Sequence, residues 1–375
     1  MNFFPAVDPA RKSAGTYYDE SLQLVELAEE LGFEHVRAGE HYGSACGGYS
    51  PDPVVFLTAA AAQTRRLRLV AGAAVSSFAH PVQIAARLAL LDNLSHGRLD
   101  AGFGPGARAV ERELFGVPVR ECRTRVSETV EACIALWSGA EVRFEGDVHR
   151  FGPVTGFPLP HQRPHPPVFL APADARACAR AGALGHHLQL APAAAGRRQL
   201  AGMAGAYRAA RRAAGHRGEG RIQLTYTCYL GTNRDVTLAR ARAGEHHRAQ
   251  LTAAAASRPG QRPLPGTPGP SVRGYDFDRA LAGHQVLAGT PDDVRAQIGT
   301  IRARYGSGIC LSLQFNPGHL PYGRAVRAME LFAAEVAPAF TRSPAPAPAS
   351  AGTGGAAVGG RGAAGGPAVA ATAAA

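Results

Sequence analysis

The chain has 375 residues, with 40 Lys and Arg against 29 Asp and Glu, which gives a formal net charge of +11 at pH 7. Because 46% of the residues are hydrophobic and 18% are charged, the chain holds enough apolar material for one large core or two ordinary ones, which excludes a fully disordered protein. Lys12 is the only lysine, and the arginines are spread over many amphipathic segments rather than clustered with aromatic residues, so we expect no nucleic-acid partner.

Short apolar segments alternate with amphipathic ones along most of the chain. Strands are predicted at residues 2–4, 35–38, 67–75, 98–104, 167–171, 187–191, 222–230 and 308–315. Helices are predicted at residues 19–31, 53–63, 81–94, 123–137, 174–183, 197–214, 234–249 and 291–304. Strands that alternate with helices in this number favour an α/β fold, a (β/α)8 TIM barrel with insertions, since a doubly wound sheet more often stops at five or six strands.

Proline and capping residues mark where several of these helices begin. Pro53, Pro81 and Pro291 stand at first-turn positions, where a missing N–H costs nothing. Thr290 supplies a capping hydroxyl just ahead of Pro291. Residues 142–151 predict a β-hairpin inserted before the fifth strand, which elaborates the barrel without adding a domain.

One barrel domain is therefore expected over residues 1–341. Within it, residues 257–274 are rich in Pro and Gly and predict a long surface loop. Residues 342–375 consist almost entirely of Ala, Gly, Pro, Ser and Thr, which lack the large side chains that offset the entropy of ordering, so they predict a disordered tail.

Localisation and metal content follow from what the sequence lacks. No segment approaches the roughly 18 to 20 uninterrupted apolar residues of a membrane helix, and the first residues lack the pattern of a signal peptide. The cysteines form no Cys-x-x-Cys pair, and adjacent histidines such as His186 and His187 point to opposite faces of a strand. We expect a cytoplasmic protein that binds no metal and no membrane.

The carboxyl ends of the strands carry the reacting groups of TIM-barrel enzymes. The second predicted strand is followed by Glu40, His41 and Tyr42, a carboxylate, an imidazole and a phenol that together predict an acid/base cluster. The alternative is that Glu40 and Tyr42 only tie the loop to neighbouring backbone.

Two further strand ends predict a face for a flat ligand. After the third strand, Ala73, Ala74 and Val75 leave room for a ligand to approach the backbone, although small residues also suit close packing against a helix. The fourth strand ends in residues 102–108, whose glycines match a dinucleotide fingerprint poorly because the third glycine is missing. We therefore favour a loop that approaches a ligand, with Arg108 as an anion contact.

The eighth predicted strand supplies polar groups to the same rim. Gln314 and Asn316 carry amides that predict contacts orienting a substrate. Loop capping by the same two side chains is the alternative.

Several segments match one known family in chain order. They are residues 31–37 leading into Glu40-His41-Tyr42, then 50–53, 64–69, 80–82 and 91–99, and near the end 289–294, 329–332 and 336–338. Together they resemble the bacterial luciferase-like flavin-dependent monooxygenases over nearly all of residues 1–341. Residues 8–11, 15–18 and 48–51 are most similar to the branch found among natural-product tailoring enzymes.

The resemblance implies a barrel that takes reduced FMN from a separate flavin reductase and reacts it with dioxygen to insert one oxygen atom into an organic substrate. It also implies a homodimer. By position, His41 corresponds to the family's catalytic imidazole, and Glu40 would orient it.

The same resemblance gives roles to the strand ends. Ala73 and Ala74 match a bulge under the flavin ring where a cis peptide occurs, and Phe103 with Gly104 belongs to the same flavin face. Phe78 and Phe103 would wall a closed, largely apolar site. Tyr42 and Phe78 would contact the substrate.

The sequence departs from the family pattern where the flavin phosphate is held. An arginine commonly follows the fourth strand, but Pro105 occupies the nearest equivalent position, and Asp174 in the fifth-strand loop would repel a phosphate. Arg108 or Arg176 would compensate, the latter from the first turn of a helix.

These features predict a flavin-dependent monooxygenase that oxygenates a hydrophobic metabolite in a biosynthetic pathway. Two alternatives remain open from the sequence. One is a non-catalytic barrel subunit with weakened flavin binding, which Pro105 favours. The other is a deazaflavin-dependent oxidoreductase that transfers hydride without dioxygen.

Overall fold

The computed structural model describes residues 1–340 except Pro5, Ala195, residues 257–274 and Ser307. The surface loop predicted at residues 257–274 and the tail predicted at residues 342–375 lie outside these described residues. The boundaries proposed for them stay predictions.

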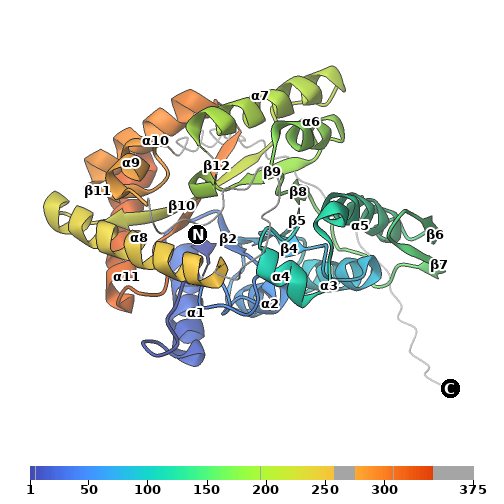
Figure 1. Cartoon of the computed structure of the whole chain (residues 1–375), viewed down its shortest axis with the longest axis horizontal. Helices are drawn as coiled ribbons and strands as arrows, with labels where there is room; N and C mark the ends of the chain where they lie inside the picture. Colours follow the sequence, from blue (N-terminus) through green and yellow to red (C-terminus); the bar gives the residue numbers. More distant parts are fainter. Residues whose placement is uncertain (5, 195, 257–274, 307, 341–375) are drawn as a thin grey trace, which may run out of the picture. The chain divides into compact units, whose positions relative to one another are not determined.

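A parallel barrel forms the centre of the described residues (Figure 1). Its strands, in spatial order, are β1 (Asn2–Phe3), β2 (His35–Ala38), β3 (Arg68–Ala71), β5 (Leu99–Gly104), β8 (Val168–Leu170), β9 (His187–Leu190), β10 (Ile222–Leu230) and β12 (Ile309–Gln314). β12 lies beside β1, because the Asn2 amide donates to Oε1 of Gln314 at 3.4 Å and the Ser312 hydroxyl donates to the Met1 carbonyl at 3.4 Å. The predicted (β/α)8 barrel is confirmed.

Two strand predictions need correction. The third strand is not continuous over residues 67–75: it stops at Ala71 and resumes as β4 (Ala74–Val75), with a cis peptide between Gly72 and Ala73. An additional short strand, β11 (Leu287–Gly289), pairs with the last residues of β10. Its three residues are too few to show a period in the sequence.

Helices cover the outside of the barrel (Figure 1). The helices that match predicted ones are α1 (Ala14–Glu30), α2 (Pro53–Gln63), α3 (Pro81–Leu94), α5 (Cys122–Trp137), α6 (Ala175–Ala183), α7 (Arg197–Ala213), α8 (Arg234–Ala256) and α10 (Pro291–Tyr305). Those without a prediction are α4 (Ala109–Leu114), α9 (Phe277–Ala282) and α11 (Tyr322–Leu331), with short turns η1 (Val119–Glu121), η2 (Pro192–Ala194), η3 (Phe332–Val336) and η4 (Ala337–Ala339).

The predicted starts of α2, α3 and α10 are confirmed, whereas α1 begins five residues before its predicted start at residue 19. Pro53, Pro81 and Pro291 occupy the first turns of α2, α3 and α10. Thr290 accepts a hydrogen bond from the backbone N–H of Asp293, whose carboxylate in turn accepts from the N–H of Thr290, which completes a capping box.

The predicted hairpin consists of β6 (Glu141–Glu145) and β7 (Arg150–Thr155). The buried Glu128 carboxylate on α5 accepts hydrogen bonds from the backbone N–H groups of Asp147 and His149 at 2.7 and 2.8 Å. This side chain therefore fixes the turn of the hairpin to the helix layer.

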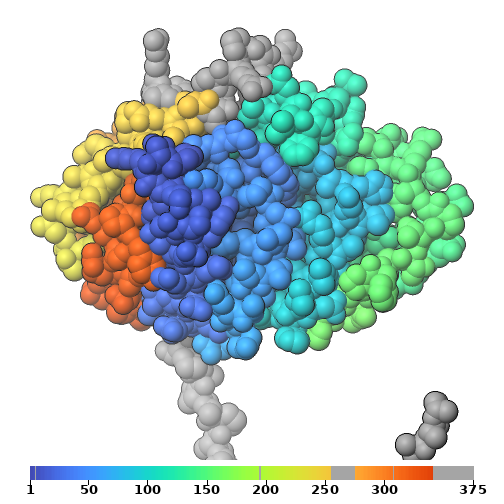
Figure 2. Space-filling view, turned by 90° about the horizontal axis from the view of Figure 1, so that it is seen from below, coloured from blue at the N-terminus to red at the C-terminus, as the bar shows by residue number. Residues whose placement is uncertain are grey.

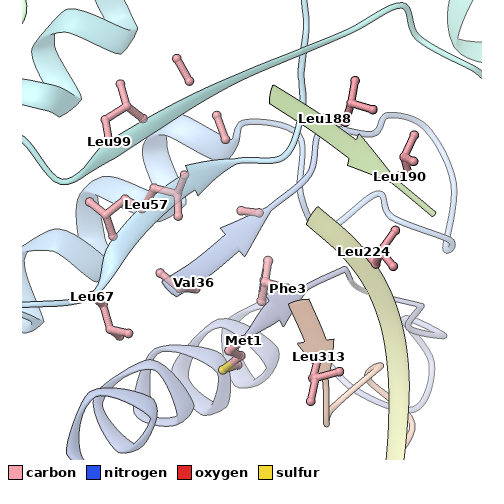
Figure 3. Packing of buried hydrophobic residues seen from close by; sticks show 14 of the residues in the cluster. Met1, Phe3, Val36, Leu57, Leu67, Leu99, Leu188, Leu190, Leu224 and Leu313 are labelled. Carbon is pink, nitrogen blue, oxygen red and sulfur yellow. The ribbon is translucent and has the colours of Figure 1, made fainter. Parts of the chain in front are cut away.

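Most strands separate an apolar outer face from a largely polar inner face. The outer face packs on the helices, as Figure 3 shows for Val36, Leu57 and Leu99. Polar side chains reach across the lumen instead: the Gln189 amide on β9 donates to the Ala71 carbonyl on β3 at 3.0 Å. Since side chains alternate along a strand, this division fixes which residues at the strand ends can face a ligand.

A buried carboxylate ties the amino-terminal end of the lumen together. Asp100 on β5 accepts hydrogen bonds from Arg68 and Arg221, at 2.5 and 3.0 Å, although these arginines belong to different segments of the barrel. In the described residues, no helix is both long enough and apolar enough to cross a membrane.

We predict that Asp100→Asn lowers the free energy of unfolding by about 2 kcal/mol, because it leaves two guanidinium groups without a countercharge. This loss of stability is smaller than the loss expected for a fully buried ion pair, because the Arg68 and Arg221 side chains are 34% and 38% exposed to solvent. Urea denaturation measures the change. Asp278→Asn, which breaks an exposed pair with Arg242, is the control and should cost less than about 0.5 kcal/mol. An equal decrease in the free energy of unfolding in Asp100→Asn and Asp278→Asn would contradict the stabilising role of Asp100.

Candidate active site

The carboxyl ends of β2, β3 and β5 lie side by side, because these strands pair directly with one another. The segments that leave them carry His41, the Gly72–Ala73 cis peptide and Arg108. The barrel therefore brings together the groups that the sequence predicted at separate positions.

A carboxylate from the unpredicted helix α4 contacts the His41 imidazole. Oε1 of Glu111 lies 2.9 Å from Nδ1 of His41, and it also accepts the backbone N–H of Tyr42 at 3.0 Å. The Glu111 side chain is fully buried, whereas that of His41 is 21% exposed. Because an ionised carboxylate only accepts, Nδ1 of His41 carries the proton and Nε2 keeps its lone pair.

Charge and burial around this pair favour a neutral imidazole. Burial and the nearby Arg108 guanidinium lower the pKa of His41 below its ordinary value, and the hydrogen bond to Glu111 opposes this only in part. Burial also opposes ionisation of Glu111, but its contacts with His41, Arg108 and the Tyr42 N–H outweigh burial and lower the pKa of that carboxyl. The arrangement is thus a neutral histidine beside an ionised glutamate.

The surroundings of His41 hold its ring in one position. The Phe4 ring meets the imidazole edge to face at 5.0 Å, and the backbone N–H of His41 donates to the Ser50 carbonyl at 2.9 Å. Gly47 has φ +91°, and a Cβ placed on it would lie 2.7 Å from Cβ of His41. Only glycine fits there, so the loop itself packs against the ring.

Glu40 does not orient His41, contrary to the expectation drawn from the family. Its carboxylate accepts the Tyr42 hydroxyl at 2.5 Å and the backbone N–H of Val75 at 2.9 Å. Burial raises the pKa of Glu40, partly offset by these two hydrogen bonds. The side chains of adjacent residues such as Glu40 and His41 point in different directions. Glu40 therefore connects the end of β2 to β4, and Glu111 contacts the His41 imidazole instead.

Arg108 belongs to the His41 cluster and not to an open anion site. Its Nη1 donates to the Ser44 hydroxyl at 3.2 Å and to the Cys46 carbonyl, and lies 3.5 Å from Oε1 of Glu111. Its guanidinium also lies over the Phe4 ring at 5.9 Å. These contacts hold the loop after β2, and they leave the predicted contact of Arg108 with a phosphate without support.

The strand ends between β3 and β8 form a cradle of small residues. A Cβ on Gly104 would lie 3.0 Å from Cβ of Ala73 and 3.7 Å from Cβ of Ala171. A Cβ on Gly72 would collide with the Arg37 side chain, and one on Gly102 with the Ala71 carbonyl. Side chains are thus kept out of the barrel mouth where a flat ring would lie.

Polar atoms without partners lie in the lumen near this cradle. Nε of Arg37, Oε1 of Gln189 and Oε1 of Gln223 are buried and have no hydrogen-bond partner among the described residues. Buried polar groups are normally satisfied, so these atoms suit the carbonyl and N–H edge of a planar heterocycle. The residues present therefore fit a flavin ring.

The predicted wall residues divide into two groups. Phe103 is fully buried and its ring packs toward Trp137 on α5, with centroids 6.5 Å apart, so it belongs to the outer core and does not wall the mouth. Phe103 alternates with Gly102 and Gly104, which face inward. Phe78 instead stacks on Phe115 at 4.6 Å, and Tyr42 meets Phe115 at 4.8 Å, which makes an aromatic cluster beside Glu40.

The amides of the eighth strand hold the chain together. Oδ1 of Asn316 accepts the backbone N–H of Gly318 at 3.0 Å, and Gln314 donates to the Phe4 carbonyl. These contacts fit the loop-capping alternative for both residues. Their predicted contact with a substrate has no support from the geometry.

The fifth-strand loop places a cation and a carboxylate at the start of α6. Arg176 is exposed in the first turn of this helix. Asp174 caps the helix by accepting the N–H of Ala177 at 2.8 Å, and it pairs with Arg123 at 2.6 Å. Since Arg123 offsets its charge, Asp174 repels an anion less than the sequence suggested.

In the described residues, no group of three or more His, Cys, Asp or Glu side chains could hold a metal ion. The cysteines in this part of the chain are free thiols. The expectation from the sequence that the protein binds no metal stays a prediction.

Comparison with known proteins places this geometry in a family. The luciferase-like monooxygenase family matches residues 1–308. The chain belongs to the luciferase-like monooxygenase family. The resemblance first seen in the sequence motifs is therefore confirmed.

Solved luciferase-like structures support the assignment. The crystal structure of monooxygenase RslO1 from Streptomyces bottropensis is 42% identical, with a TM-score of 0.83 over 91% of this chain and 99% of that one. The oxygenating constituent of 3,6-diketocamphane monooxygenase from Pseudomonas putida is 19% identical, with a TM-score of 0.71 over 90% of this chain and 97% of that one. The latter shows a shared fold alone.

Among curated luciferase-like relatives, the oxygenase component of flavin-dependent trigonelline monooxygenase from Acinetobacter baylyi is 31% identical over 177 residues. These residues make up 47% of this chain and 49% of that protein. The chain spans about half the length of the curated relatives it matches.

Sequence reasoning missed two residues of this luciferase-like site. Glu111 lies on a six-residue helix directly after the fourth strand's loop, and a carboxylate so close to a strand exit was the available signal. Arg37 lies one residue before the end of β2, where alternation from His35 turns it into the lumen. Both are charged residues in or shortly after a strand's carboxyl end.

We predict that Glu111→Gln lowers the pKa of His41 further, because it removes the negative charge that stabilises the imidazolium while retaining an acceptor for Nδ1. Titration of the His41 ring by 1H–15N correlation NMR measures this shift. The wild-type ring should titrate below 6.5 as the Nδ1–H tautomer. A wild-type pKa above 6.5, or no change in the variant, would contradict the described pair.

Proposed function

We propose that this chain is the oxygenase component of a flavin-dependent monooxygenase, which uses reduced FMN from a separate reductase and dioxygen to oxygenate a hydrophobic metabolite in a biosynthetic pathway. The observation that carries the proposal is an imidazole with a free Nε2, held by a buried carboxylate beside a cradle of glycine and alanine at the barrel mouth. A cytoplasmic homodimer belongs to the same proposal.

The proposed cofactor has support of two kinds. The luciferase-like relative from Acinetobacter is named as flavin-dependent and as an oxygenase component, which favours a flavin delivered by a partner reductase. The lumen offers a donor at Nε of Arg37 and an acceptor at Oε1 of Gln189 for the polar edge of the ring. We assign the ring to Ala73, Ala74, Val75 and Gly104, and the phosphate to Arg176.

Reduced FMN, when bound, supplies two electrons for the reaction, in which one atom of dioxygen enters the substrate and the other leaves as water. The residues of the chain supply the proton chemistry. Because Nδ1 of His41 is occupied by Glu111, only Nε2 can accept a proton from a reacting oxygen and return it. Glu111 stabilises the imidazolium while the proton is held.

Neighbouring residues position this base and keep water away. Glu40 bridges Tyr42 to the N–H of Val75, which fixes the third strand's exit against the second. Phe4 covers one edge of the imidazole. The aromatic cluster of Tyr42, Phe78 and Phe115 gives the rim an apolar surface, which suits a hydrophobic substrate.

A non-catalytic barrel subunit is the second candidate function. Pro105 favours it, and so does the engagement of Arg108 with the loop after β2, since both leave the phosphate with fewer cations. The pair of His41 and Glu111 favours the enzyme, because it leaves Nε2 of an imidazole with a lowered pKa available at a strand exit.

Titration of the purified protein with reduced FMN, oxidised FMN and a reduced deazaflavin separates these functions. Reduced FMN should bind more tightly than the other two. Absence of binding would favour the non-catalytic subunit, and preference for the deazaflavin would favour a hydride-transferring oxidoreductase. Oxygen uptake with a reductase and candidate metabolites, with peroxide measured alongside, then tests oxygenation itself.

We predict that His41→Ala lowers product formation about 100-fold or more, because it removes the imidazole that accepts and returns the proton, while reduced FMN still binds. Oxygen uptake should continue as uncoupled peroxide production. His246→Ala changes an exposed histidine on α8 and serves as the control with unchanged product formation. Normal product formation by His41→Ala would remove this residue from the mechanism.

The dependence of product formation on pH follows from the lowered pKa of His41. The neutral imidazole is the active form, so activity should be lost as the pH falls through a pKa below 6.5 and be retained above it. Glu111→Gln should move this acidic limb to still lower pH. A limb centred above 6.5, or one that moves upward in the variant, would contradict the assignment.

A further inference from the structure

A second cavity lies outside the barrel, away from His41. It has a volume of about 680 Å³ and lies between the first turns of α8 and the helix α11, over the end of β10. α8 and α11 lie side by side in both views, in yellow and orange (Figures 1 and 2). None of the residues assigned to the candidate active site lines this cavity.

The base of the cavity belongs to the apolar outer face of the barrel. Phe315 forms part of it, and its ring packs on Phe33 and Phe332 with centroids 5.9 and 5.6 Å away. Leu230, Val236 and Leu331 add aliphatic surface. A ligand here therefore needs an apolar body to displace water favourably.

Three arginines stand around this apolar base: Arg240 from α8, and Arg324 and Arg327 from α11. In the part of the chain that the structure describes, none of the three side chains has a hydrogen bond or an ion pair. Glu330 is the one carboxylate among the lining residues, and it forms no ion pair there either.

Several arginines that border the barrel have a carboxylate partner instead. Arg68, Arg221 and Arg248 are each paired with a buried carboxylate, Asp100 or Glu245. Three guanidinium groups beside one carboxylate, around an apolar surface, leave an excess of positive charge that an oxyanion would satisfy by bidentate hydrogen bonds. The volume lies within the range of about 300 to 1,000 Å³ for small-molecule sites.

We propose that this cavity binds a small amphiphilic anion, with one carboxylate or phosphate head on the arginines and an apolar body over Leu230, Val236 and Leu331. The site is separate from the barrel mouth, so it stands or fails independently of the proposed oxygenase function. The ligand would be a fatty acyl carboxylate or an alkyl phosphate, because both carry an oxyanion head on an apolar body.

Isothermal titration calorimetry of the full chain with decanoate, below its micelle concentration, tests the proposal. One decanoate should bind per chain. Acetate, which lacks the apolar body, and decylamine, which has the opposite charge, should bind at least tenfold more weakly. Decyl phosphate, compared with decanoate, shows which oxyanion head the arginines prefer, and binding of either supports the site.

Two variants locate the binding. Arg324→Gln combined with Arg327→Gln should weaken decanoate binding about tenfold or more, and Arg198→Gln, an exposed arginine on α7, should leave it unchanged. Val236→Trp fills the cavity from an exposed position and should abolish binding without disturbing the core. Circular dichroism confirms that each variant is folded.

Three results would overturn the proposal. The first is that neither decanoate nor decyl phosphate binds. The second is that decylamine binds as tightly as decanoate. The third is that the affinity for decanoate stays unchanged in the double variant or in Val236→Trp. Tight binding of an acidic peptide in place of decanoate would also overturn it, since it would make the groove a protein-docking surface.

Discussion

The hydrogen bond between Glu111 and Nδ1 of His41 is the interaction on which the candidate site depends. It joins the loop after β2 to the helix after β5, and the same carboxylate accepts the Tyr42 N–H and lies near Arg108. One buried charge therefore sets the tautomer of the imidazole, the path of two loops and the direction in which Nε2 points. Phe4 and Gly47 pack against the His41 ring, but the bond to Glu111 is what selects which ring nitrogen carries the proton.

The division of most strands into an inner and an outer face explains the different chemistry of the two sites. The inner face is largely polar, and Nε of Arg37, Oε1 of Gln189 and Oε1 of Gln223 have no hydrogen-bond partner there among the described residues. The outer face is apolar, and the pocket between α8 and α11 is lined by aliphatic side chains and arginines. Each site takes its chemistry from the side of the sheet it adjoins.

The sequence predicts the frame of this fold well, for reasons that are local. Pro53, Pro81 and Thr290 act within one turn of a helix, so the starts of α2, α3 and α10 can be read directly. The strand exits follow from the barrel, and with them the position of His41. Short elements such as α4 and β11 show no period, and they were missed.

Side-chain partners were harder to predict than positions. Glu40 and Glu111 are both carboxylates near a strand exit, and only the folded chain shows that the residue 70 positions away contacts His41, while the adjacent residue bonds to Val75. The family resemblance places Phe103 at the flavin face as an apolar wall, but strand alternation turns its ring outward to Trp137. Arg108 was read as a free cation, yet the Cys46 carbonyl engages it.

A crystal structure of the protein with FMN bound tests the central claim most directly. The described geometry predicts that the ring lies in the barrel mouth over Ala73 and Gly104, with Nε2 of His41 turned toward it and Glu111 still on Nδ1. Electron density for FMN elsewhere, including the pocket between α8 and α11, or an imidazole whose Nε2 faces away from the ring, would contradict it.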